Sequence, residues 1–130
     1  MSVELDGPGA REYLAAKEGC APEALSVTAL GGGVSNHVLL VESPKRRCVV
    51  KQSLGKLRVE QDWFARRDRI WREAEALRCL EPLLPPGSVP SLLYEDRDNY
   101  VMAMSAAPGD HSWKAVLMAG EATDAQARTI

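Results

Sequence analysis

Residues 25–53 read LSVTALGGGVSNHVLLVESPKRRCVVKQS, and this stretch decides the fold. It contains short β-prone runs that are separated first by a triple glycine and then by a Ser-Pro-Lys-Arg turn. Parallel neighbours would need a crossover of about a dozen residues or more, and neither connection provides one. The runs therefore predict an antiparallel meander. Its expected strands are Leu25–Leu30, Val38–Val41 and Cys48–Ser53.

The residues after this meander predict a long helix and a second hairpin. The helical stretch runs from about Val59 to Leu80 and is ended by the proline-rich segment 82–90. Two β-prone runs, Leu92–Glu95 and Tyr100–Met104, then flank a polar turn. The apolar face of the expected helix is formed by Ile70, Leu77 and Leu80.

A shorter helix is expected before the meander, at Arg11–Gly19, where the glycine is placed to end it. Together these elements predict an α+β fold in which one long helix packs on an antiparallel sheet of about five strands. The expected organisation is an amino-terminal helical segment at residues 1–24, a lobe built on the sheet at 25–105, and a further segment at 106–130.

The composition is that of a folded domain with little net charge. Of the 130 residues 45% are apolar, which predicts a core, and a formal net charge of -2 lacks the basic field of nucleic-acid binders. A nucleic-acid binder that used the basic stretch Lys56–Arg78 would show affinity that falls steeply with salt. Three cysteines without a Cys-x-x-Cys pair predict neither a disulfide framework nor a zinc site. The start lacks a secretory signal and no apolar run would span a membrane, so we expect a cytoplasmic protein without a membrane partner.

The triple glycine belongs to the pattern Gly31-x-Gly33-x-x-Asn36-x-Val38 between two expected strands. Glycines let a backbone approach phosphates closely and point its N–H groups at them. A Rossmann loop would have to open a helix, and a Walker loop needs a Gly-Lys-Ser/Thr sequence that is absent. A kinase-like phosphate loop and a glycine-rich hairpin bend without a ligand both fit the pattern.

Lys51 and Glu73 are the charged residues that favour the phosphate loop. Because side chains alternate along a strand, Val49 and Lys51 share a face, where they could touch an adenine ring and its phosphates. Glu73 lies within the apolar stripe of the expected helix, and a carboxylate there needs a cation. We expect Lys51 to pair with it, as in the lysine–glutamate pair of kinases. The alternatives are an exposed Lys51 and a Glu73 that pairs with an arginine such as Arg69.

The sequence contains, in this order, a glycine loop, a lysine on a strand, a glutamate on a helix, two further strands and a Pro-Gly pair at their exit. In that order it resembles the amino-terminal lobe of the aminoglycoside phosphotransferase family, which has a protein-kinase-like fold, and within that family the methylthioribose kinase branch. The resemblance covers most of residues 25–120 and rests on residues 31–36, on Lys51-Gln52 and on the stretch 62–70 before Glu73.

The resemblance implies an ATP-binding lobe at residues 25–105, followed by the hinge and the start of a second lobe. Lys51 would bind phosphates, Glu73 would orient it, and Trp113 would start the helix beyond the hinge or simply pack that helix. The implied nucleotide site consists of Gly31, Gly32, Gly33, Ser35, Asn36, Val38, Val49, Lys51, Met102, Met104, Ser105 and Ala106.

The sequence lacks the parts that perform phosphoryl transfer in this family. Neither His37 nor His111 begins a His-x-Asp motif, and no later aspartate motif could bind a metal. We therefore expect no turnover by these residues alone, and Mg²⁺ only in a longer enzyme. The leading hypothesis is the lobe of a kinase for a sugar-like or amino-alcohol metabolite that binds nucleotide and a second lobe. The alternative is a stand-alone protein-interaction module without nucleotide binding. Exposed apolar surface would favour self-association in either case.

Overall fold

The computed structural model describes residues 3–30, 35–54, 66–107 and 117–129, and it has an α+β fold. A five-stranded antiparallel sheet has the order β1-β2-β3-β5-β4, so the three-stranded meander and the second hairpin join through β3 and β5. The antiparallel sheet predicted from the sequence is thus confirmed. Its strands are β1 (Ser26–Ala29), β2 (Asn36–Glu42), β3 (Arg47–Ser53), β4 (Leu92–Asp96) and β5 (Val101–Ser105).

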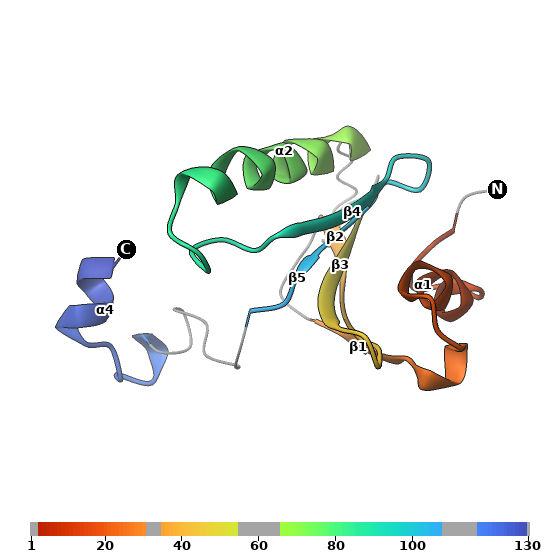
Figure 1. Cartoon of the computed structure of the whole chain (residues 1–130), viewed down its shortest axis with the longest axis horizontal. Coiled ribbons are helices and arrows are strands. Elements are labelled where there is room, and N and C mark those ends of the chain that lie inside the picture. Colours follow the sequence, from red (N-terminus) through yellow and green to blue (C-terminus); the bar gives the residue numbers. More distant parts are fainter. Residues whose placement is uncertain (1–2, 31–34, 55–65, 108–116, 130) are drawn as a thin grey trace, which may run out of the picture.

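Helices lie on both faces of this sheet, α2 on one and α1 on the other (Figure 1). Gly19 ends α1 as expected, because its φ of 67° is left-handed and its N–H caps the last turn. Within the described residues, no helix is both long and apolar enough to span a membrane. The α-helices are α1 (Ala10–Glu18), α2 (Ile70–Leu80) and α4 (Asp124–Thr129), and the short 3-10 helices are η1 (Pro22–Ala24), η2 (Arg67–Arg69) and η3 (Glu81–Leu83).

The helix expected over Val59–Leu80 is shorter than predicted. Arg66 has an extended backbone with a ψ of 132°, and only the 3-10 turn Arg67–Arg69 precedes the start of α2. The side chains of Arg67 and Arg69 donate to the carbonyl oxygens of Ser53 and Leu54, so this turn is held against the end of β3. Residues 59–65 lie outside the described residues.

The apolar face of α2 also differs from the predicted one. Ile70, Ala74 and Leu77 are buried at i, i+4 and i+7, and they pack on Met102 of the sheet. Leu80, which was expected on this face, is 42% exposed. At about 100° per residue Leu80 lies about 80° away from Ile70 around the helix, outside the buried stripe formed by Ile70, Ala74 and Leu77.

Alternation along β3 divides the sheet into two different faces. Cys48 and Val50 are buried with Leu14 and Ala15 of α1 in the larger core, whereas Val49 and Lys51 are half-buried on the α2 side. This division follows from the two-residue period of a strand and agrees with the expected placement of the valine and the lysine.

Asp96 fastens α1 to the turn between β4 and β5. Its carboxylate accepts hydrogen bonds from the Tyr13 hydroxyl at 2.6 Å and from the Asn99 side chain at 2.7 Å, and Lys17 lies 3.8 Å away. Burial alone would raise the pKa of Asp96, but these hydrogen bonds and the lysine charge outweigh it and hold the pKa below its usual value. The following Tyr100, with a φ of 54°, closes the turn, so β5 begins one residue later than predicted.

We expect Asp96→Asn to lower the free energy of unfolding by about 1–2 kcal/mol at pH 7, because it weakens hydrogen bonds to a charged group. The lowered pKa means that the carboxylate stabilises the fold above the unfolded-state pKa of about 3.9 and loses this effect as pH falls through the folded-state pKa. Urea unfolding between pH 7 and pH 3 should therefore show the two proteins converging in acid. Asp98→Asn, at an exposed position two residues away, is the matched control. An equal loss in that variant would contradict the role of Asp96.

Candidate functional site

Lys51 and Glu73 form an ion pair between the sheet and α2. The Lys51 ammonium donates to a Glu73 carboxylate oxygen at 2.5 Å, and their side chains are 19% and 37% exposed. The buried stripe of α2 fixes the rotation of the helix, so that Glu73 points toward the sheet. The predicted pairing is confirmed as a contact, and an exposed, unpaired Lys51 is excluded.

Arg69, the other partner considered for Glu73, binds elsewhere. Its guanidinium donates to the backbone carbonyl oxygens of Ser35 and, at 2.7 Å, of Leu54. Burial and the neighbouring Arg67 charge lower the pKa of Arg69, in that order. The residue just before α2 is therefore tied to the segments that begin β2 and end β3. No residue pattern indicates these contacts, because every residue has a backbone carbonyl oxygen.

The apolar residues predicted for the nucleotide site share the face of Lys51. In the sheet register Val38 lies opposite Lys51, which in turn lies opposite Met102, and Val49 lies opposite Met104. Directly opposed residues in antiparallel strands project from the same face. Met102 is buried under α2, whereas the others remain half-buried and offer apolar surface beside the charged pair. The structure thus brings together Val38, Val49, Lys51, Glu73, Met102 and Met104.

Two buried polar atoms on the same face have no hydrogen-bond partner among the described residues. They belong to Asn36 and Ser53, which lie opposite each other in the register of β2 and β3, and the unpartnered atoms are Asn36 Oδ1 and Ser53 Oγ. Ser53 is fully buried, and unpaired buried polar atoms are costly. Ser53 was not predicted as a site residue, although its position two residues after Lys51 already placed it on that face.

The predicted hinge residues lie at the end of β5. Ser105 still belongs to this strand, and its amide donates to the Ser91 carbonyl oxygen at 2.9 Å, so an adenine could use that amide only by replacing this bond. A hollow of about 250 Å³ adjoins Ser105 and Ala106, and residues 87–90 line its other side. The apolar residues around Lys51 do not line this hollow, so it is not the space beside the ion pair.

Some predicted residues lie outside the described part of the chain. These are the glycines Gly31, Gly32 and Gly33 and the residue beyond the hinge, Trp113. Their roles stay predictions. Ser35, the next loop residue, is described, and its carbonyl oxygen is held by Arg69.

Comparison with known proteins assigns neither a family nor a function to this chain. No protein-family model matches this sequence, and no curated protein matches it at a significant level. The resemblance to the aminoglycoside phosphotransferase family therefore stays a prediction, and the geometry around Lys51 has to carry the functional argument.

Proposed function

We propose that this chain is the ATP-binding lobe of a small-molecule phosphotransferase with a protein-kinase-like fold, of the aminoglycoside phosphotransferase type. The observation that carries the proposal is the ion pair of 2.5 Å between Lys51 of β3 and Glu73 of α2. A half-buried ion pair by itself contributes little to stability, so its position beside apolar surface and unpaired polar atoms favours a binding role.

The residues of this face fit the parts of a nucleotide. The half-buried side chains of Val38, Val49 and Met104 provide apolar contact area for a base. Lys51 would donate to phosphate oxygens while Glu73 fixes its orientation. When bound, Mg²⁺ would neutralise charge on the phosphates.

The remaining parts of such an enzyme belong to the proposal as well. The catalytic base, the Mg²⁺ ligands and the pocket for a sugar-like or amino-alcohol acceptor would come from a second lobe. We place the protein in a reducing cytoplasm, consistent with the free thiols of Cys20, Cys48 and Cys79.

The proposal predicts that the full 130-residue chain binds MgATP weakly and that Lys51→Ala weakens this binding by about tenfold to a hundredfold. The expected loss is that of a charge-assisted hydrogen bond to phosphate. Isothermal titration calorimetry measures it, and Glu73→Gln should give a smaller loss because it only misplaces the lysine.

Lys45→Ala is the matched control, because Lys45 is exposed in the turn between β2 and β3. Equal affinity in Lys51→Ala and Lys45→Ala would contradict a phosphate-binding Lys51. Absence of measurable MgATP binding by the wild-type chain would contradict the proposed function itself.

A protein-interaction module without nucleotide binding is the second candidate. It is favoured by exposed apolar side chains around the end of α2 and near the carboxyl terminus, since such surface marks contact with other chains or lobes. Sedimentation that shows self-association independent of ATP, together with no nucleotide binding, would support it. The exposed side chains are Leu80, Leu83, Leu84, Leu117 and Met118.

A further inference from the structure

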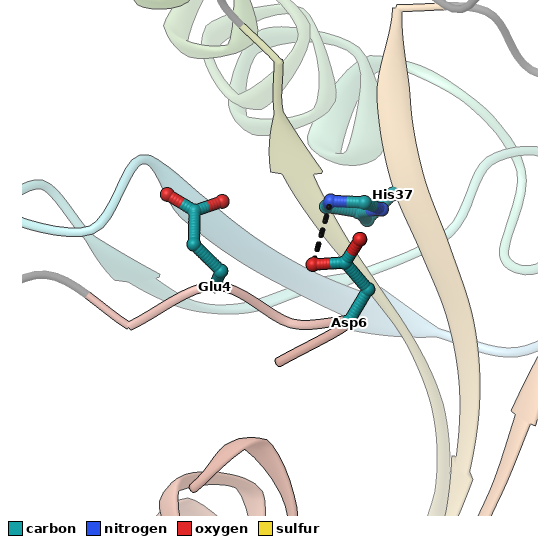
Figure 2. Close-up of side chains that lie close together, drawn as sticks. All are labelled: Glu4, Asp6 and His37. Carbon is teal, nitrogen blue, oxygen red and sulfur yellow. Dashed lines mark ion pairs between the residues drawn. The ribbon is translucent and has the colours of Figure 1, made fainter. Parts of the chain in front are cut away.

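A second cluster of chemically active side chains lies on the opposite face of the sheet. Figure 2 shows Glu4 and Asp6 on the amino-terminal segment and His37 on β2, with the Asp6 carboxylate facing the imidazole. His37 is only 6% exposed, whereas both acids are exposed. Alternation along β2 points His37 away from Val38 and hence away from the face of Lys51.

Backbone contacts position the two acids beside the histidine. The amide of Leu5 donates to Gln52 Oε1 at 2.9 Å, and the amide of Val3 donates to Asn99 Oδ1 at 2.7 Å. A tight turn follows, in which the Gly7 amide donates to the Glu4 carbonyl oxygen at 3.0 Å. The carboxylates are therefore carried by a segment that is fixed to the sheet on both sides of Glu4.

The separations of the donor atoms suit a small divalent ion. His37 Nε2 lies 3.4 Å from Asp6 Oδ1. In a tetrahedral zinc site with bonds of about 2.0–2.1 Å, two ligand atoms lie about 3.3 Å apart. One ligand atom from each of the three residues lies within 4.8 Å of the others, so a small rotation of the exposed Glu4 side chain completes the set. Among the described residues no other group of histidine, cysteine and acidic side chains meets this spacing.

The donor set and the space around it favour zinc over magnesium or calcium. Imidazole nitrogen is a ligand of zinc and similar transition metals, whereas the harder ions prefer oxygen alone. A hollow of about 260 Å³, lined by Asp6, His37 and apolar neighbours such as Leu5 and Leu39, adjoins the cluster. It leaves room for a water molecule as the fourth ligand.

We propose that Glu4, Asp6 and His37 form a binding site for a divalent transition-metal ion of the zinc type, which fastens the amino-terminal segment to β2. The ion adds a third fixation to those made by Gln52 and Asn99. This site is independent of the nucleotide site, because it lies on the other face of the sheet.

The test is metal binding by the whole chain in a Cys79→Ser background, which removes an exposed thiol that could bind zinc on its own. Calorimetry should show one Zn²⁺ per chain, and Co²⁺ should give the visible absorption of a tetrahedral complex. Glu4→Gln and Asp6→Asn should each weaken Zn²⁺ binding by more than about tenfold, since even loss of an outer partner of a ligand has this effect. His37→Gln should abolish it.

Glu12→Gln is the matched control, because it makes the same chemical change at an exposed position of α1. Zn²⁺ should raise the melting temperature of the control but not of Asp6→Asn, since only a protein that binds the ion is stabilised by it. Equal Zn²⁺ affinity in all variants would overturn the proposal. The proposal would also be overturned if Asp6 and His37 behaved as an ion pair alone. In that case Asp6→Asn would lower the melting temperature, and Zn²⁺ would change the melting temperature of neither the control nor Asp6→Asn.

Discussion

Arg46→Met is expected to lower the free energy of unfolding by about 3–5 kcal/mol, because it leaves a buried carboxylate without its cation. Glu18, the last residue of α1, has a side chain that is only 1% exposed. Arg46 donates to both of its oxygens, at 2.8 and 3.2 Å. The other donor to Glu18 is the Cys48 thiol, whose sulfur lies 3.4 Å from a carboxylate oxygen. Burial, and then the charge of Glu18, raises the pKa of this thiol to about 12, so the thiol stays protonated. A single thiol cannot replace a two-pronged guanidinium.

Urea unfolding followed by circular dichroism measures this loss. Arg47→Met is the matched control: this side chain is 42% exposed and lies 3.9 Å from Glu42, so its removal should change stability by less than about 0.5 kcal/mol. The double variant Glu18→Met/Arg46→Met should recover most of the loss, since apolar replacements of a buried pair are often neutral. An Arg46→Met variant as stable as the Arg47→Met control would show that Glu18 does not depend on Arg46.

The sequence predicted the sheet and the Lys51–Glu73 pair because both depend on local periodicity. The two-residue period of β3 placed Val49 and Lys51 on one face, and the helical period placed Glu73 toward the sheet. The same two-residue period also places Ser53 on the face of Lys51, and it places His37 on the other face of the sheet from Val38. Charge then selected the partner, since a carboxylate on an inward face needs a cation.

Contacts between distant segments were not predictable in this way. Arg69 binds backbone carbonyl oxygens 15 and 34 residues away, and the Glu18–Arg46 pair spans 28 residues. A local pattern gives the face of a residue but not the segment that covers it. The predicted start of α2 was wrong for the same reason, because the side chains of Arg67 and Arg69 bind carbonyl oxygens at the end of β3 and just after it, contacts that no local pattern indicates.

Gln52→Leu is expected to lower the free energy of unfolding by about 2–4 kcal/mol, because buried backbone groups lose their partners. Gln52 is fully buried, its Oε1 accepts from the Leu5 amide at 2.9 Å, and its Nε2 donates to the carbonyl oxygens of Val3 at 2.6 Å and Asn99 at 2.9 Å. Leucine has a similar size but can make none of these bonds. Urea unfolding measures the loss, and hydrogen exchange at the Leu5 amide should become faster because this segment detaches first.

A truncated chain and a ligand measurement distinguish the structural role of Gln52 from the proposed phosphate-binding role of the neighbouring Lys51. If Gln52 acts through the amino-terminal segment, Gln52→Leu should cost less than about 1 kcal/mol in a chain that lacks residues 1–5, because most of the lost bonds are then already absent. A loss of equal size with and without these residues would contradict this explanation. Because Gln52 points to the α1 face, MgATP affinity should stay unchanged in Gln52→Leu while it falls in Lys51→Ala. One strand would then hold two adjacent residues with separable functions, the glutamine fastening the amino-terminal segment and the lysine binding phosphate.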